Sequence, residues 1–206
     1  MSLVLVYNKI FKGSKMKIAV FHNLPSGGAK RALYGFVRYL VSTGNSVDVF
    51  IPSTANEEFL PLKDIANNVY VFPVKNTILG MIYSTFQYVP PVRISLVDLE
   101  KTEKKIAHII NRRDYDVVLS EQDQFTMSPF FLKYIKKPTV YYCQQPSRHH
   151  EAILQRLSQK RYQGTYYKFV WRFWKTYLER LLKTDIENAS YSKYTVTNSY
   201  YSHILE

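Results

Sequence analysis

The stretch MKIAVFHNLPSGGAKRALYGFVRYLVSTGNSVDVFI, residues 16–51, decides the fold of this chain. Residues 17–21 are predicted as a strand, and residues 18–21 form an apolar run without polar alternation, as is typical of a parallel strand covered by helices on both faces. From Ala29 onward the apolar side chains recur at helical spacing, and Gly44-Asn45 predicts the end of that helix. Residues 46–51, rich in β-branched and aromatic residues, have the pattern of a second strand. We therefore predict a strand, a turn, a helix and a second, parallel strand in direct succession.

A turn with two adjacent glycines joins the first strand to the helix. Gly27 and Gly28 allow positive φ and close approach of the backbone to a ligand, and the carboxyl ends of strands are where open α/β sheets bind ligands. The glycines either only close a tight turn or present backbone amides to a phosphate, and both readings stay open here. An NAD site and a P-loop are disfavoured, because neither glycine spacing occurs at this turn.

The alternation of strands and helices continues toward the carboxyl end. Further strands are predicted at 68–73, 116–120, 139–143 and 194–199, and further helices at 96–113, 127–135 and 151–183. The apolar segment 74–94 is predicted as a helix packed on the sheet, with an exposed acceptor-site or membrane loop as the alternative. The predicted fold class is α/β, a Rossmann-like, doubly wound parallel sheet with a long helical excursion before the last strand.

The composition and net charge of the chain indicate which classes of partner it can bind. The formal net charge is +12 over 206 residues, which favours an anionic partner: phosphate, an anionic membrane surface or nucleic acid. The single cysteine, Cys143, fits a reducing compartment, so we expect a cytoplasmic protein, with the inner face of a membrane as a candidate location. No metal site is predicted, because no carboxylate or cysteine lies at ligand spacing from His149 and His150.

Three signatures resemble the amino-terminal domain of GT-B glycosyltransferases, particularly the large retaining family four (glycosyl transferase group 1). The first is Gly27-Gly28, then the helix, then GNSVDV at 44–49. The second is YYCQQPSR at 141–148, similar to a Tyr-Cys-His-Thr-Pro-x-Arg pattern of that family. The third is Asn198-Ser199 at the end of the last strand.

This resemblance implies an activity and a set of site residues. The activity is metal-independent transfer of a sugar, with retention, from a nucleotide-sugar to a glycan or lipid-linked acceptor, without a further cofactor. Gly27 and Gly28 would face the donor diphosphate. Gln144, which replaces the family histidine, is a catalytic candidate together with His149 and His150. Candidates for binding the acceptor or the sugar are Ser120, Glu121, Gln144, Arg148, Asn198 and Ser199. A capping role for Ser120 or Asp123 at the next helix is the alternative.

The resemblance also implies a domain organisation. Residues 1–15 would be an amino-terminal extension, and 16–206 the acceptor-side domain of an enzyme whose carboxyl-terminal donor domain is absent. We therefore expect the chain to fold alone without measurable sugar transfer. The alternative is a non-catalytic module with the same fold that binds a membrane or nucleic acid. Nucleic acid is the less favoured partner, because the sequence has no RRM, KH or helix-turn-helix signature.

Basic and aromatic residues alternate through the predicted helical excursion at 151–183. Its apolar stripe is expected either to pack on the core or to lie at an anionic membrane surface. In both cases the basic side chains could hold the domain on such a surface, with an attraction that weakens in salt. The residues concerned are Arg156, Lys160, Arg161, Lys168, Arg172, Lys175, Arg180 and Lys183, beside Trp171, Trp174 and Tyr177.

Overall fold

A computed structural model describes residues 15–88, 94–144 and 165–198 of the chain. Its centre is a parallel sheet with the strand order β3-β2-β1-β4-β5-β6. The strands are β1 (Lys17–Asn23), β2 (Ser46–Pro52), β3 (Asn68–Phe72), β4 (Val117–Asp123), β5 (Thr139–Cys143) and β6 (Tyr194–Thr197). Every neighbouring pair is parallel. The predicted doubly wound α/β fold is therefore confirmed. The predicted extension at 1–15 lies, except for Lys15, outside the described residues.

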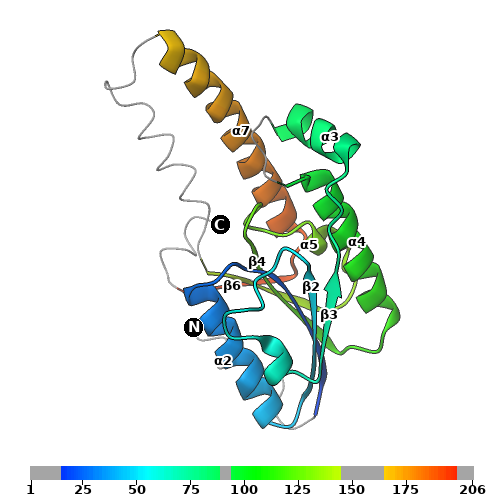
Figure 1. Ribbon diagram of the computed structural model, residues 1–206. Helices are drawn as coiled ribbons and strands as arrows, with labels where there is room; N and C mark the ends of the chain where they lie inside the picture. Colours follow the sequence, from blue (N-terminus) through cyan, green and yellow to red (C-terminus); the bar gives the residue numbers. More distant parts are fainter. Residues whose placement is uncertain (1–14, 89–93, 145–164, 199–206) are drawn as a thin grey trace.

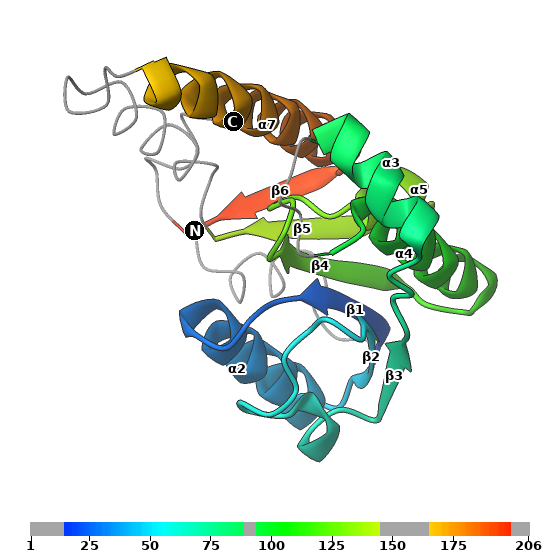
Figure 2. The ribbon, with the colours of Figure 1, turned by 45° about the horizontal axis from the view of Figure 1, so that its top comes forward.

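Helices cover both faces of this sheet, as Figures 1 and 2 show. One face carries α2 (Gly28–Ser42), and the other carries α4 (Leu96–Arg112) and α5 (Phe131–Tyr134). Side chains of β1 alternate between the two cores: Ile18 and Val20 pack on the α2 side, whereas Ala19 and Phe21 pack on the α4 side. All four are buried, which explains why the strand sequence shows no polar alternation.

Strand β1 pairs with β2 on one side and with β4 on the other. The first pairing joins Lys17 to Ser46, a short distance along the chain. The second joins Ile18 to Val117, which requires the chain to return after about a hundred residues. The centre of the sheet therefore depends on one strand pair that is close in sequence and on another whose strands are about a hundred residues apart.

The segment after β3 differs from the prediction. It forms α3 (Ile78–Tyr88), which contacts α4 and α7 (Thr165–Ser190) instead of packing on the sheet. Figure 2 shows α3 lying over α4, away from the sheet. The prediction was wrong because it took the apolar residues of the segment as the packing face. The side that faces the protein instead carries the buried residues Gly80 and Ser84.

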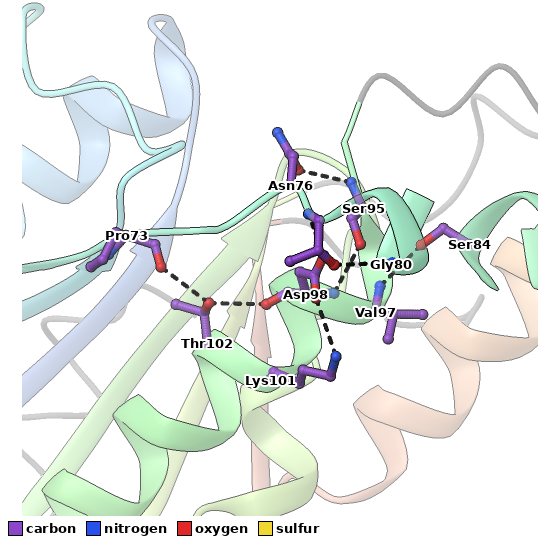
Figure 3. Close-up of polar contacts among 10 residues, drawn as sticks. Pro73, Asn76, Gly80, Ser84, Ser95, Val97, Asp98, Lys101 and Thr102 are labelled. Atoms are coloured by element: carbon purple, nitrogen blue, oxygen red, sulfur yellow. Dashed lines mark hydrogen bonds and ion pairs between the residues drawn. The ribbon is translucent and has the colours of Figure 1, made fainter. Parts of the chain in front are cut away.

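Polar contacts around Asp98 fix α3 against the first turn of α4, as Figure 3 shows. Asp98 Oδ2 accepts hydrogen bonds from the backbone N–H and the hydroxyl of Thr77, at 3.0 and 2.8 Å. Ser95 caps α4 by accepting the N–H of Asp98 at 3.1 Å. Burial disfavours the charge on Asp98, yet the hydrogen bonds from Ser95, Thr77 and Lys101 outweigh it and lower the pKa to about 2. The α3–α4 junction is thus held by an ionised, well-bonded carboxylate.

Gly80→Ala is expected to disrupt the α3–α4 junction, because an added Cβ would overlap the Asp98 carboxylate and the Ser95 hydroxyl. We expect a loss of roughly 1–3 kcal/mol in the free energy of unfolding, measured by urea denaturation. Gly35→Ala is the control, since a Cβ at Gly35 meets no atom within 4 Å and alanine favours the helix interior of α2 by roughly 0.5–1 kcal/mol. Equal effects of the two changes would show that the contact at Gly80 is not tight.

The helix predicted at 127–135 is reduced to the single turn of α5. Strand β4 runs on to Asp123, whose Oδ1 accepts the N–H of Phe125 at 2.6 Å and that of Thr126 at 3.0 Å. Met127 then takes a left-handed conformation with φ of 63°. Ser128 precedes Pro129, which further disfavours helical geometry at that position. The side chain of Asp123 therefore organises a turn directly before the segment that was predicted as a helix.

The helical excursion before β6 is present as α7, which ends seven residues after the predicted boundary. Residues 151–164 lie outside the described part of the chain. Leu178 and Leu181 are buried, and Leu181 packs in a core cluster with Tyr177, so this part of the stripe faces the core as one of the two alternatives predicted. The described basic side chains Arg172, Lys175, Arg180 and Lys183 are exposed. Within the described residues, the structure has no helix of the length and hydrophobicity that a membrane crossing requires.

Candidate functional site

The winding of the sheet reverses between β1 and β4. From β1 the chain proceeds outward to β2 and β3, and from β4 it proceeds in the other direction to β5 and β6. The carboxyl ends of β1 and β4 are therefore the topological switch point, where open α/β sheets bind ligands. His22 and Asn23 end β1 here, and residues 121–123 end β4.

The glycine turn opens α2 at this edge of the sheet. Gly27 is the N-cap, with φ of 145° and ψ of −163°, a conformation that disfavours residues with a side chain. The first intrahelical bond runs from Arg31 N to the Gly27 carbonyl at 3.1 Å, so the amides of Gly28, Ala29 and Lys30 have no acceptor within the helix. The N-cap offers no side-chain acceptor either. An added Cβ at Gly28 would meet no atom within 4 Å, so the space beside the Gly28 Cα is open.

Gln144, directly after β5, reaches back to this turn. Its side-chain Nε2 donates to the carbonyl of Ala29 at 3.3 Å and to Glu121 Oε2 at 3.1 Å. These three residues come from the first turn of α2, the end of β4 and the end of β5. The contact therefore brings two of the three sequence signatures, and the predicted Glu121, to one place.

Glu121 is a fully buried carboxyl group at the switch point. Burial raises its pKa to about 8, against the opposing effect of the hydrogen bond from Gln144. The side chain is therefore predominantly protonated at neutral pH. Its second oxygen, Oε1, has no hydrogen-bond partner among the described residues. A neutral carboxyl with an unused oxygen thus lies beside the amino terminus of α2.

A buried ionic cluster supports the other side of the glycine turn. Lys30, fully buried in the first turn of α2, forms an ion pair with Glu57 from the loop after β2. His22 Nε2 lies 3.2 Å from Lys30 Nζ and 3.4 Å from Glu57 Oε1. The other oxygen of Glu57 accepts the N–H of Leu62 at 2.9 Å. The cluster therefore ties the start of α2 to β1 and to the loop after β2.

The protonation states within this cluster follow from burial and hydrogen bonding. Burial lowers the pKa of His22 to about 4, so the ring is neutral at pH 7. His22 Nδ1 accepts the N–H of Leu24 at 3.3 Å, which assigns the ring proton to Nε2, facing Glu57. For Glu57, burial raises the pKa, but hydrogen bonds from His22 and Lys30 outweigh it and bring the pKa to about 2. Glu57 is therefore the anion that compensates Lys30.

Glu103 and Asp123 form a pair of buried carboxyl groups next to the switch point. Burial and the neighbouring Asp123 raise the pKa of Glu103, and burial also raises the pKa of Asp123. Like charges so close cannot both form, so the pair retains a proton. Asp123 Oδ2 accepts from Asn23 Nδ2 at 2.5 Å, and Asn23 Oδ1 accepts from Thr54 Oγ1 at 2.9 Å. These bonds hold the ends of β1, β2 and β4 together.

The remaining predicted site residues are distributed as follows. Ser120 is buried within β4, and its hydroxyl contacts the Glu121 carbonyl at 3.4 Å, so it does not project from the strand end. Asn198 is exposed directly after β6, the neighbour of β5. Cys143 is a buried residue of β5. Predicted residues outside the described part of the chain are Arg148, His149, His150 and Ser199. Among the described residues, no three His, Cys, Asp or Glu side chains gather as metal ligands do.

Sequence reasoning missed Lys30 and Glu103, although both carry a signal in the sequence. Lys30 lies three residues before Leu33 and seven before Val37, which puts it on the buried stripe of α2. Glu103 occupies the equivalent place on α4, between Leu99 and Ile106. A charged residue in register with an apolar stripe is the pattern that would have identified both positions.

Known proteins give no information about the function of this site. No family model and no curated protein matches the chain. A solved structure that is similar to it is the C-terminal domain of a hydrogenase from Pyrococcus furiosus, at 13% identity and a TM-score of 0.41. The similarity covers 64% of this chain and 96% of that domain. A likeness of this extent carries no argument about function.

Proposed function

We propose that this chain is the acceptor-side half of a retaining glycosyltransferase that uses a nucleotide-sugar donor. The observation that carries the proposal is the contact of Gln144 with both Glu121 and the Ala29 carbonyl. Gln144 belongs to one signature of the resemblance and Ala29 follows the glycines of another, although 115 residues separate them. Two of the signatures that resemble a glycosyltransferase thus meet at the switch point of the sheet.

The amino terminus of α2 suits the diphosphate of such a donor. The amides of Gly28 and Ala29 lack intrahelical acceptors, and the first turn of α2 contains no acidic side chain. The helix dipole adds partial positive charge at the same point, which favours a bound anion. The neutral state of Glu121 matters here as well, because an ionised carboxylate at that position would repel a phosphate group.

The neighbouring polar groups suit the sugar or the acceptor. Gln144 is partly exposed and can donate and accept at once, whereas Glu121 is fully buried and orients the Gln144 amide by accepting its hydrogen bond. Gln144 cannot carry a positive charge, so its role is to orient hydroxyl groups and not to stabilise charge as an imidazolium would. The Lys30–Glu57–His22 cluster positions the turn without facing a ligand, because Lys30 is fully buried.

Gly28→Val tests the diphosphate site. We expect the backbone amide signals of Gly28 and Ala29 to shift in ¹H–¹⁵N NMR spectra when pyrophosphate or a panel of nucleotide-sugars is added to the chain. The valine side chain should obstruct the approach and weaken the affinity at least tenfold, which corresponds to about 1.4 kcal/mol. The fold should persist, since the added side chain begins in open space.

Gly35→Val on the same helix is the matched control, because Gly35 is exposed and a Cβ there also meets no atom within 4 Å. It should leave the amide shifts and the affinity unchanged. If the wild-type amides do not respond, or if Gly28→Val binds as tightly as the wild type, the glycines only close a turn and the proposed donor site is wrong.

A further inference from the structure

Helix α3 exposes large apolar side chains, whereas its described buried residues are Gly80 and Ser84. Four large apolar side chains face solvent and together form what we call the α3 face. They are Ile78 (81% exposed), Leu79 (69%), Ile82 (47%) and Tyr83 (64%). Their spacing of three and four residues puts them on one side of the helix. None of the eleven residues of α3 is charged. An exposed apolar patch of this kind on a surface helix is typical of an interaction site.

The contacts with α4 prevent α3 from turning this face inward. Thr77 is bonded to Asp98, and its hydroxyl accepts the N–H of Gly80 at 3.0 Å. One turn further along, Ser84 Oγ accepts the N–H of Val97 at 3.2 Å. Figure 3 shows Gly80 and Ser84 directed toward the start of α4. Rotation of the helix about its axis would break these bonds, so the orientation of the α3 face is fixed by the fold.

Positive charge surrounds the helix that carries this face. Lys75 is exposed three residues before α3, whereas Lys101 on α4 pairs with the Asp98 carboxylate at 3.2 Å and adds no net charge. The helix α7, which contacts α3, carries the exposed side chains Arg172, Lys175, Arg180 and Lys183. The acidic residues of α7 are Glu179, Asp185 and Glu187. Lys175 Nζ lies 3.7 Å from the Glu179 carboxylate, and Lys133 Nζ lies 3.6 Å from that of Glu187. The described charged residues of these elements therefore leave an excess of cations near an apolar patch.

We propose that the α3 face inserts into the interfacial region of an anionic membrane while the neighbouring lysines and arginines contact the lipid headgroups. Apolar and aromatic residues combined with cations are what an anionic lipid surface binds. The helix lies in the plane of the surface, because eleven residues extend only about 16 Å, well short of the ~30 Å of a bilayer core. This inference does not rest on the proposed glycosyl transfer.

The net charge of the chain favours a lipid surface over a second copy of the chain as the partner of the α3 face. Each copy carries a net charge of +12. Association through the α3 face would bring the surrounding cations of two copies together, and like charges repel. An anionic lipid surface instead neutralises them, at roughly 1 kcal/mol for each basic side chain near the headgroups. The same surface both covers the apolar side chains and compensates the charge.

Sedimentation with vesicles tests this proposal. The wild-type chain should bind vesicles of phosphatidylcholine containing 30 mol% phosphatidylglycerol, and bind much less to phosphatidylcholine alone or in 1 M salt. Leu79→Ser with Ile82→Ser should lower the partition coefficient at least tenfold. The matched control is Ile186→Ser with Val71→Ser, because these side chains are also exposed, at 62% and 58%, but are not part of the α3 face. The control should bind as the wild type does.

All three proteins should unfold at the same temperature, because every changed side chain is exposed. Equal binding of the two double variants would overturn the proposal, as would failure of the wild type to bind acidic vesicles. Sedimentation velocity without lipid adds a further criterion: a wild-type dimer that Leu79→Ser with Ile82→Ser converts to monomer would assign the α3 face to self-association.

Discussion

Lys30→Met is expected to lower the free energy of unfolding by about 3 kcal/mol at pH 7. The substitution removes the cation and leaves the carboxylate of Glu57 without compensation in a site where burial already disfavours its charge. Loss of one partner from a buried ion pair typically costs about 3–5 kcal/mol. We place the effect at the lower end, because the Glu57 side chain is 22% exposed and water can reach part of it.

A second substitution distinguishes the ion pair from simple packing. Lys30→Met combined with Glu57→Leu removes both charges and should recover most of the lost stability, since well-packed apolar replacements of buried pairs are often neutral. Urea denaturation of the two single variants and the double variant gives the coupling free energy directly. If Lys30→Met costs under 1 kcal/mol, or if the double variant is as unstable as the sum of the singles, the pair does not stabilise the start of α2.

Glu121→Gln should abolish a large part of the decline in stability between pH 5 and pH 8. The fold raises the pKa of Glu121 from 4.5 to about 8, so folding favours the protonated form. The stabilisation is fully present below pH 4.5 and is lost as the pH rises to about 8. At about 1.36 kcal/mol per pH unit, the wild type loses roughly 4 kcal/mol over these three units through this group. Glutamine has a similar shape but does not ionise, so the variant should escape this loss.

The measurement is urea denaturation of both proteins at closely spaced pH values. The difference between them isolates Glu121, because Glu103 and Asp123, whose pKa values are also raised, are common to both. His22 acts in the opposite sense: its lowered pKa costs stability as the pH falls from 6.5 toward 4, equally in both proteins. Glu58→Gln, at an exposed position, is the control. Parallel curves for the wild type and Glu121→Gln would mean that Glu121 is ionised in the fold.

The sheet could be predicted because its strands are local patterns. The apolar runs at β1, β2 and β5 have the composition of covered parallel strands, and the predicted boundaries lie within two residues of the observed ones. The position of α3 could not be predicted in this way. Its apolar residues suggested a core helix, whereas Gly80 and a network around Asp98, 18 residues further along, determine the side that packs.

The candidate site, like the fold, could be predicted from the sequence only in part. The sequence indicated Gly27 from a turn pattern, Glu121 from a strand end and Gln144 from the resemblance to a family pattern. Their juxtaposition depends on β4 lying next to β1 and on Gln144 reaching back across 115 residues, which no local pattern contains. The ionisation state of Glu121 could not be predicted from the sequence either, because burial sets its pKa and burial is a property of the folded chain.

The pairing of β1 with β4 sets the order in which the protein can acquire its site during synthesis. β2 follows β1 closely and can pair with it early, but the other edge of β1 has no partner until Val117–Asp123 leave the ribosome. At about 5–20 residues per second, that interval is roughly 5–20 s. During this time an apolar strand edge is available to other nascent chains, and the hazard is aggregation. The strand that completes the switch point is therefore also the strand that ends the most vulnerable stage of the chain's synthesis.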